Sequence, residues 1–214
     1  MNRSKIAKLQ FITPPSLKDE ELLDISNELC SRGLRWIQFR KKFQEEELNE
    51  YSKAACIQLG KALLAICKKH HSKLIINDHV WLFEALGADG LHLGRKDFSI
   101  EKARLQFGNE VILGTSSNSI HDLMEACQKG ADYSGLGPIH VTSTKPDHNP
   151  TLGWEKTIEI ISSFKTELPI VLIGGISQRD LPLHPSLESC GIALSSALVN
   201  TSAISNFQTY LTNF

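Results

Sequence analysis

The 214-residue sequence has no apolar run that approaches the length of a membrane-spanning helix, and no long apolar stretch follows the basic residues near its start. Neither a transmembrane protein nor a signal peptide is therefore expected. Its 23 lysine and arginine residues nearly balance its 24 acidic ones, which leaves a formal net charge of −1. This balance gives no reason to expect a nucleic acid or an acidic membrane as the partner.

Cysteine is also scarce. The five cysteines are widely scattered and none forms a CxxC pair: Cys30, Cys56, Cys67, Cys127 and Cys190. This usage favours reduced, mostly packed thiols in a cytoplasmic protein. The sequence also has no evident Ser/His/Asp set and no evident cysteine nucleophile.

Short apolar runs typical of strands alternate with segments of helical periodicity along the whole chain. The runs predict strands at about 9–13, 36–40, 74–76, 90–93, 111–114, 132–137, 169–173 and 191–194. The periodicity predicts helices at about 17–31 with Ser16 as N-cap, 45–69, 80–86, 100–107, 120–129, 154–164 and 202–211. A helix between residues 174 and 191 is poorly supported, because Pro182 and Pro185 interrupt it.

Eight strand-then-helix units without a linker predict a parallel sheet. Eight such units close naturally into a (β/α)₈ TIM barrel, and 214 residues lie near the short end of that fold's range. We therefore expect a single α/β domain over residues 1–214, with an open doubly wound sheet as the alternative. In such a barrel the active site lies at the C-terminal ends of the strands.

Two neighbouring strand ends carry a carboxylate. Asp78 follows the third predicted strand, and Asp97 follows the fourth. Adjacent parallel strands lie about 5 Å apart, so the two carboxylates could converge on one hard cation. Oxygen ligands of this kind suit Mg²⁺.

The second strand ends with Gln38, Arg40 and Lys42 at every other position. A strand alternates its faces, so these side chains share one side. Two cations and an amide on one face suit a phosphate-rich ligand. With Asn77, Lys145 and a metal ion they describe a site for a diphosphate leaving group.

A second, uncharged group of strand ends suits a monophosphate. It consists of Thr142, Ser143, Thr144, Gly175, Ser195 and Ser196. The loops after strands seven and eight are the usual phosphate site of this fold. Two phosphorylated ligands at one barrel mouth indicate transfer of a group from its diphosphate to a second phosphorylated molecule. Because no protein nucleophile is evident, departure of the diphosphate is the expected central event.

These residues resemble the thiamine phosphate synthase (thiamine-phosphate pyrophosphorylase) family, from Leu9 to about Val199. The matching motifs are Gln38-Phe-Arg-Lys-Lys42, Ile76-Asn-Asp78, Gly87-Ala-Asp-Gly-Leu-His-Leu-Gly94 with Asp97, Gly130-Ala-Asp-Tyr133, Gly137-Pro-Ile139, Thr142-Ser-Thr-Lys145, Ile173-Gly-Gly-Ile176 and Ser196-Ala197. The resemblance implies a (β/α)₈ enzyme of thiamine biosynthesis that joins hydroxymethylpyrimidine diphosphate to thiazole phosphate and releases diphosphate.

Position by position, the resemblance implies three groups of site residues. Gln38, Phe39, Arg40, Lys41, Lys42, Asn77, Ser116 and Lys145 would hold the pyrimidine diphosphate, with Arg40, Lys42 and Lys145 acting on its developing charge. Asp78 and Asp97 would hold Mg²⁺. Thr142, Ser143, Thr144, Gly175, Ser195 and Ser196 would hold the thiazole phosphate.

Some positions depart from the family pattern. Arg95-Lys96 stands where glutamine and an acid are usual, His79 replaces an arginine, and His140-Val141 replaces an aromatic-proline pair. A related thiazole tautomerase carries a catalytic histidine at the position of Pro138, so His140 keeps that activity as an alternative. A non-catalytic sensor of phosphorylated ligands is another, although it would need no metal. The partners expected are small molecules, and the oligomeric state stays open, a homo-oligomer included.

Overall fold

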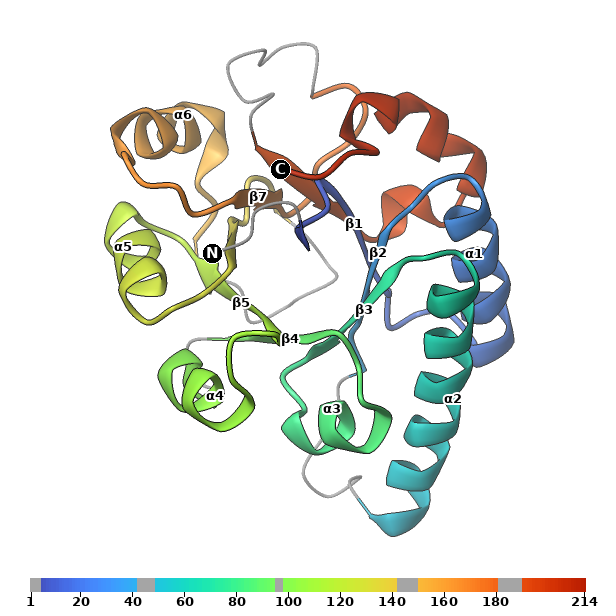
Figure 1. Ribbon diagram of the computed structural model, residues 1–214. Coiled ribbons are helices and arrows are strands. Elements are labelled where there is room, and N and C mark those ends of the chain that lie inside the picture. Colours follow the sequence, from blue (N-terminus) through green and yellow to red (C-terminus); the bar gives the residue numbers. More distant parts are fainter. Residues whose placement is uncertain (1–4, 42–48, 95–97, 142–149, 181–189) are drawn as a thin grey trace.

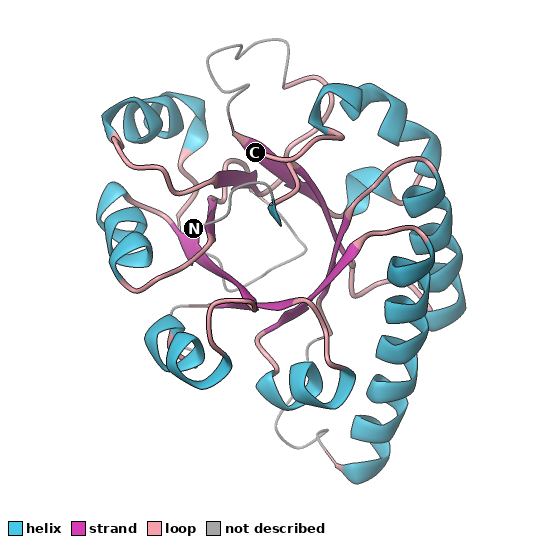
Figure 2. Ribbon diagram, in the orientation of Figure 1, coloured by secondary structure: helices cyan, strands magenta, loops and turns pink. Residues whose placement is uncertain are grey.

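Eight parallel strands close into a barrel in chain order. The computed structural model describes residues 5–41, 49–94, 98–141, 150–180 and 190–214. Helices surround the barrel (Figures 1 and 2). The closing pair is β1 with β8, where Leu9 lies opposite Ile192 and Phe11 opposite Leu194. The predicted single-domain (β/α)₈ barrel is confirmed, and the open doubly wound alternative is wrong.

In the described chain an α-helix follows each of the first six strands. The strands are β1 (Leu9–Ile12), β2 (Trp36–Phe39), β3 (Lys73–Asn77), β4 (Gly90–Leu93), β5 (Ile112–Ser117), β6 (Tyr133–Leu136), β7 (Ile170–Ile173) and β8 (Gly191–Leu194). The helices are α1 (Asp19–Ser31), α2 (Glu50–Lys69), α3 (Val80–Leu86), α4 (Ile100–Phe107), α5 (Ile120–Gln128) and α6 (Gly153–Ser163), followed by the 3₁₀ segments η5 (Ser196–Leu198) and η6 (Thr201–Tyr210).

Two helices begin later than the sequence predicts, because of how their first turns are capped. The N-cap of α1 is Lys18 rather than Ser16, since the Glu21 carboxylate reaches back to accept the Lys18 N–H at 3.1 Å. The N-cap of α2 is Asn49, whose side chain accepts the Ser52 N–H at 2.9 Å. The helix α2 therefore begins at Glu50, and the predicted start at residue 45 lies outside the described residues.

Two further differences concern the second half of the chain. Strand β5 continues to Ser117, three residues beyond its predicted end. The last helix is a 3₁₀ segment with a break at Phe207, where φ is −118°. After β7 no helix is found in residues 174–180, and the proline-broken segment 181–189 lies outside the described residues.

Side chains alternate between the inside and the outside of the barrel. Those that point inward pack together and fill the interior: Ile12, Trp36, Ile75, Ile112, Tyr133, Val171 and Ala193. Ile6 and Ala7 join this cluster from the segment before β1. Their neighbours in the strands face outward and pack in the main core with the helices. The interior is thus a packed core rather than a pore.

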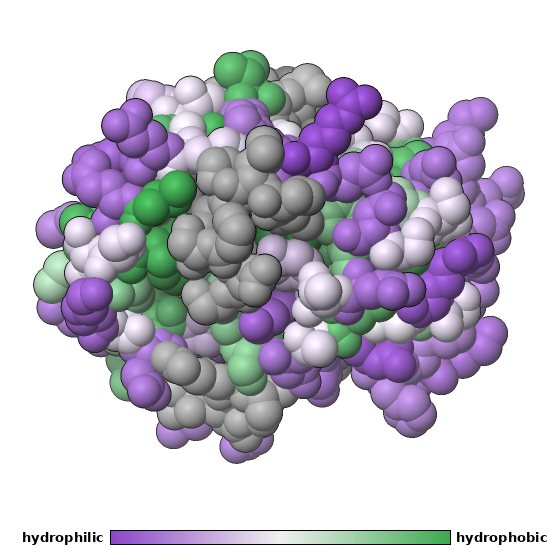
Figure 3. All heavy atoms as spheres, turned by 90° about the horizontal axis from the view of Figure 1, so that it is seen from above, coloured by the Kyte–Doolittle hydropathy of each residue, from purple (hydrophilic) through white to green (hydrophobic). Residues whose placement is uncertain are grey.

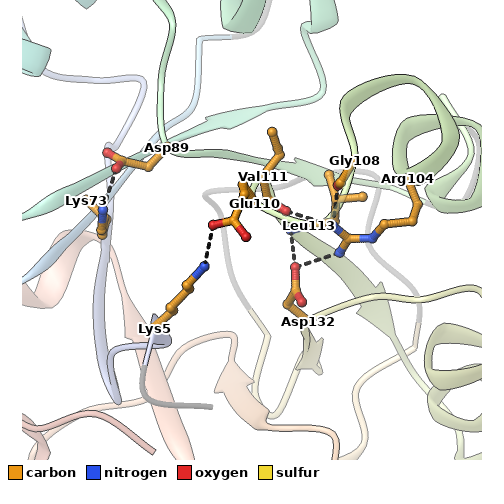
Figure 4. A network of polar contacts seen from close by, with 9 residues as sticks. All are labelled: Lys5, Lys73, Asp89, Arg104, Gly108, Glu110, Val111, Leu113 and Asp132. Atoms are coloured by element: carbon orange, nitrogen blue, oxygen red, sulfur yellow. Dashed lines mark hydrogen bonds and ion pairs between the residues drawn. The ribbon is translucent and has the colours of Figure 1, made fainter. Parts of the chain in front are cut away.

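Polar contacts fix the strands at the N-terminal end of the barrel (Figure 4). Asp89, directly before β4, accepts the Leu74 N–H of β3 at 2.9 Å. Asp132, directly before β6, accepts the Leu113 N–H of β5 at 2.8 Å. Lys73 and Arg104 pair with these two carboxylates at 2.6 and 2.7 Å. The two Ala-Asp motifs, Ala88-Asp89 and Ala131-Asp132, therefore set strand register. They lie at the end of the barrel opposite the mouth, which is formed by the C-terminal ends of the strands.

Hydrophilic residues cover most of the surface visible in Figure 3, with apolar residues in small areas between them. Within the described ranges no helix is long and apolar enough to cross a membrane. All five cysteines are free, and all but Cys127 are buried, as predicted.

Candidate active site at the barrel mouth

The end of β2 places two polar side chains inside the barrel. Gln38 and Arg40 are 3% and 7% exposed. The Thr13 hydroxyl, at the end of β1, accepts the Arg40 N–H at 2.9 Å and fixes this strand end. The two side chains share one face, as strand alternation predicts.

Phe39 and Lys41 lie on the other side of β2. Phe39 packs in the core beneath the helices, and Lys41 pairs with Asp19 of α1 at 3.3 Å. The Lys41 carbonyl contacts the His79 ring at 2.8 Å, which ties this loop to the end of β3. Neither side chain points into the mouth. If these two residues bind the pyrimidine diphosphate, as the resemblance implies, they would bind it through their backbone atoms.

Arg40 is the buried cation of the mouth. Burial lowers the pKa of Arg40, and the charge of Asp78 works against that change. A guanidinium stays charged at neutral pH even so, because its ordinary pKa lies far above it. A desolvated positive charge with a planar set of donors is well suited to phosphate oxygens.

The end of β3 turns sharply to present a carboxylate. Asp78 has a φ of +62°, in the left-handed region that non-glycine residues rarely adopt. Its carboxylate accepts the Asn77 side-chain N–H at 2.5 Å and the Gly94 backbone N–H at 3.3 Å. The Asp78 N–H donates to His92 O at 2.9 Å. Hydrogen bonds with Asn77, His92 and Gly94 therefore hold this strained turn in place.

The donor set at this turn fits a hard cation. Asp78 offers carboxylate oxygens beside the end of β4, and Gly94 is the last described residue before Asp97. Asp97 itself, with the unusual Arg95 and Lys96, lies outside the described residues. The pairing of two aspartates around Mg²⁺ remains a prediction.

Three side chains form a polar chain inside the barrel below the mouth. His92 Nε2 lies 3.0 Å from Ser116 Oγ, and His92 Nδ1 lies 2.9 Å from the Tyr133 hydroxyl. Burial raises the pKa of Tyr133 far above its ordinary value, and the Gln38 side chain opposes that rise. His92 is buried within β4, but its hydrogen bonds and the position of Tyr133 could not be read from sequence.

The loops after β6 and β7 pack closely against each other at two glycines of the β7 loop. Gly174 and Gly175 have φ values of +101° and +65°. A Cβ on Gly174 would lie 2.5 Å from Pro138, and one on Gly175 would lie 2.8 Å from the Cβ of His140. Gly175 is exposed, so its backbone is accessible to a phosphate.

A second contact joins the same two loops. His140 Nε2 lies 3.0 Å from Asp180 Oδ1, and the Trp154 indole N–H donates to that oxygen at 3.3 Å. The Ser177 hydroxyl and backbone N–H both donate to Asp180 Oδ2 at 2.7 Å. The Asp180 carboxylate therefore links the ends of β6 and β7 to the start of α6.

The end of β8 offers hydroxyl groups. The Ser195 Oγ is buried and has no hydrogen-bond partner within the described part of the chain. Ser196 follows it and is exposed. A buried hydroxyl without a partner is costly, and a ligand oxygen here would satisfy it.

A cavity of about 170 Å³ adjoins the mouth between α4 and α5. It is lined by Gly94 and Ser116 on one side and by Asp122 and Lys129 on the other. Asp122 forms an acidic group with His121 and Glu125, but its carboxylate already accepts the Asn118 N–H at 2.9 Å. We therefore infer that this group stabilises the start of α5 and is not part of the candidate active site.

The structure brings part of the predicted site together at one end of the barrel. The described members are Gln38, Arg40, Asn77, Asp78, Ser116, Gly175, Ser195 and Ser196. The predicted residues that lie outside the described ranges are Lys42, Asp97, Thr142, Ser143, Thr144 and Lys145.

The fold and these strand ends define a class: (β/α)₈ enzymes that bind phosphorylated small molecules at the C-terminal barrel mouth. Residues 9–198 match the family model for thiamine monophosphate synthase. The chain belongs to this family.

Curated relatives agree with this assignment, and a solved structure has a similar fold. The chain is 39% identical over 170 residues to a thiamine-phosphate synthase of Bacteroides thetaiotaomicron, covering 78% of each chain. It is 37% identical over 198 residues to that of Phocaeicola vulgatus, covering 91% of each. The fold resembles a thiamine phosphate pyrophosphorylase from Pyrococcus furiosus with a TM-score of 0.74 at 24% identity, over 98% of this chain and 96% of that one.

Proposed function

We propose that this transferase joins hydroxymethylpyrimidine diphosphate to thiazole phosphate, releases diphosphate and forms thiamine phosphate. Family membership supports the reaction. The observation that carries it is the buried Arg40 beside Asn77 and Asp78 at the barrel mouth. A cation, an amide and a carboxylate at one point suit a diphosphate bound with a divalent ion.

Arg40, Lys42, Asn77 and Lys145 would hold the diphosphate, and Asp78 with Asp97 would hold Mg²⁺. When bound, Mg²⁺ would neutralise charge on the diphosphate oxygens. The thiazole phosphate would lie at Thr142, Ser143, Thr144, Gly175, Ser195 and Ser196. The exposed backbone of Gly175 supports that position, and so does the Ser195 Oγ, which is buried and has no hydrogen-bond partner among the described residues.

In the reaction the bond between the pyrimidine methylene carbon and the diphosphate oxygen breaks, and the electron pair leaves with the diphosphate. The thiazole nitrogen then supplies the pair for the new C–N bond. Arg40 is buried and lies near the charge of Asp78. Its guanidinium stabilises the negative charge that grows on the leaving diphosphate. The interior packed below the mouth limits water near the electron-poor carbon.

The proposal includes small-molecule partners and a cytoplasmic location. Free cysteines support the location, because an oxidising compartment favours disulfides.

The experiment incubates the purified protein with both substrates and Mg²⁺ and measures thiamine phosphate by mass spectrometry. Formation of product supports the synthase. If no product forms although the protein is folded and binds thiazole phosphate, the proposal fails. A tautomerase would then be tested through His140→Phe, and binding without any turnover would indicate a sensor.

A further inference from the structure

One residue of the loop after β6 holds the loop after β7 on both sides of Gly175. The His140 backbone N–H donates to the Gly174 carbonyl at 3.0 Å, directly before Gly175. The His140 imidazole lies 3.0 Å from Asp180 Oδ1, which follows Gly175 in the same loop. A Cβ on Gly175 would lie 2.8 Å from the Cβ of His140. His140 therefore bridges the segment that contains Gly175 and contacts it closely.

Asp180 fixes the orientation of the His140 imidazole. A carboxylate accepts hydrogen bonds but does not donate them, so Nε2 of His140 carries the proton of this bond. The Asp180 carboxylate also accepts the Ser177 backbone N–H at 2.7 Å and the Trp154 indole N–H at 3.3 Å. The Trp154 ring lies edge-on to the imidazole, with ring centroids 5.7 Å apart. The imidazole is thus held by Asp180 and by α6.

The Gly175 backbone is the described part of the loop after β7 that the proposed function assigns to the thiazole phosphate. Gly174 and Gly175 both have positive φ values, of +101° and +65°. Two glycines in succession allow the backbone to approach an anion closely, but glycine is also the residue with the most conformational freedom. Backbone N–H groups bind a phosphate most tightly when they are held in place before the ligand binds. The contacts of His140 on both sides of Gly175 supply that restraint.

We propose that His140 is a positioning residue for the thiazole phosphate, and that it acts by holding the Gly175 backbone through its bond to Asp180. The inference rests on the proposed function. It gives His140 no proton transfer with a ligand, and in this it differs from the tautomerase alternative.

His140→Ala tests the proposal, because it removes the imidazole and keeps the backbone bond to Gly174. We expect the KM for thiazole phosphate, and its Kd in isothermal titration calorimetry, to rise about tenfold, the size of one weakened hydrogen bond to a charged group. The KM for the pyrimidine diphosphate should change less than about twofold. His140→Gln should restore the KM for thiazole phosphate to within about threefold of the wild type, because its amide N–H can replace the Nε2 donor.

His70→Ala is the matched control. His70 Nε2 also lies 3.0 Å from a side-chain oxygen, Asn27 Oδ1, but at the C-cap of α2. This helix leads into the N-terminal end of β3, away from the mouth. The control variant should keep both KM values within about twofold of the wild type.

A double-mutant cycle tests whether His140 acts through Asp180. If it does, His140→Ala with Asp180→Ala should raise the KM for thiazole phosphate no more than about twofold beyond Asp180→Ala alone. Increases that multiply would overturn the proposal. Should Asp180→Ala fail to fold, the rescue by His140→Gln decides the question alone.

The outcomes separate this inference from the proposed function. A wild type that binds thiazole phosphate but forms no thiamine phosphate would remove the proposed function and leave the Kd comparison to decide the inference. A wild type that does neither would remove both. A His140→Ala variant with KM and Kd for thiazole phosphate within about twofold of the wild type would overturn the inference alone. Equal increases in KM for both substrates, or no rescue by His140→Gln, would show a structural role only and would also overturn it.

Discussion

Arg104 of α4 is expected to be the main single contributor to stability among the polar residues at the N-terminal end of the barrel. Its guanidinium donates to three backbone carbonyls, those of Gly108, Val111 and Gly130, at 2.8 to 3.2 Å. It also pairs with Asp132 at 2.7 Å (Figure 4). Arg104→Ala would remove all of these contacts at once.

The size of the effect follows from burial. The side chains of Arg104 and Asp132 are 17% and 21% exposed. Removing one partner of a buried pair costs about 3–5 kcal/mol, and hydration of the partly exposed groups moves the value to the lower end. Asp132 also keeps its bond from the Leu113 N–H. We therefore expect Arg104→Ala to lower the free energy of unfolding by about 3 kcal/mol.

Urea unfolding followed by circular dichroism measures this change. At a slope of about 3 kcal/mol per molar, the midpoint should fall by about 1 M. Arg32→Ala is the control, because Arg32 also pairs with a carboxylate, Glu28 at 2.6 Å, but both side chains are 45% exposed. Its loss should cost less than about 1 kcal/mol. Equal shifts in the two variants would show that burial of the Arg104–Asp132 pair adds no stability.

Two further predictions concern the mouth. Arg40→Lys keeps the charge but loses the planar donors, so kcat/KM for the pyrimidine diphosphate should fall at least about tenfold in steady-state assays; an unchanged value would contradict a role for Arg40. Burial would raise the pKa of Asp180, but hydrogen bonds from Ser177, His140 and Trp154 outweigh it and lower that pKa. The stabilisation is therefore present above about pH 4 and is lost as the pH falls through the lower folded value. Asp180→Asn should lower the melting temperature at pH 7 but not near pH 2, and a difference that is independent of pH would refute this.

Much of the fold follows from local sequence patterns. The apolar runs at Leu74–Ile76 and Gly90–Leu93 predict β3 and β4 because a strand buried on both faces needs continuous apolar residues. Alternation within β2 likewise predicts that Gln38 and Arg40 face the interior together. The order of the strand ends then places the polar residues at one mouth.

Contacts between distant residues could not be predicted in this way. The Tyr133 hydroxyl bonds to a ring 41 residues earlier, and that contact depends on the register across three strands. The Ala-Asp motifs contribute to the family resemblance, but only the structure shows that Asp89 and Asp132 fix strand register. The N-caps at Lys18 and Asn49 could not be predicted either, since in each the backbone N–H donates to a side chain three residues further along.

We propose that two phosphorylated substrates react at the barrel mouth and that Asp78 binds the metal ion the reaction needs. The most direct measurement is the rate of thiamine phosphate formation at increasing Mg²⁺, for the wild type and for Asp78→Ala. Asp24→Ala serves as the control, because Asp24 is an exposed carboxylate on α1. We predict that product formation requires Mg²⁺ and is abolished by excess chelator. It should be lost in Asp78→Ala and retained in Asp24→Ala. Product formed at the wild-type rate in chelator, or by Asp78→Ala, would contradict the proposal.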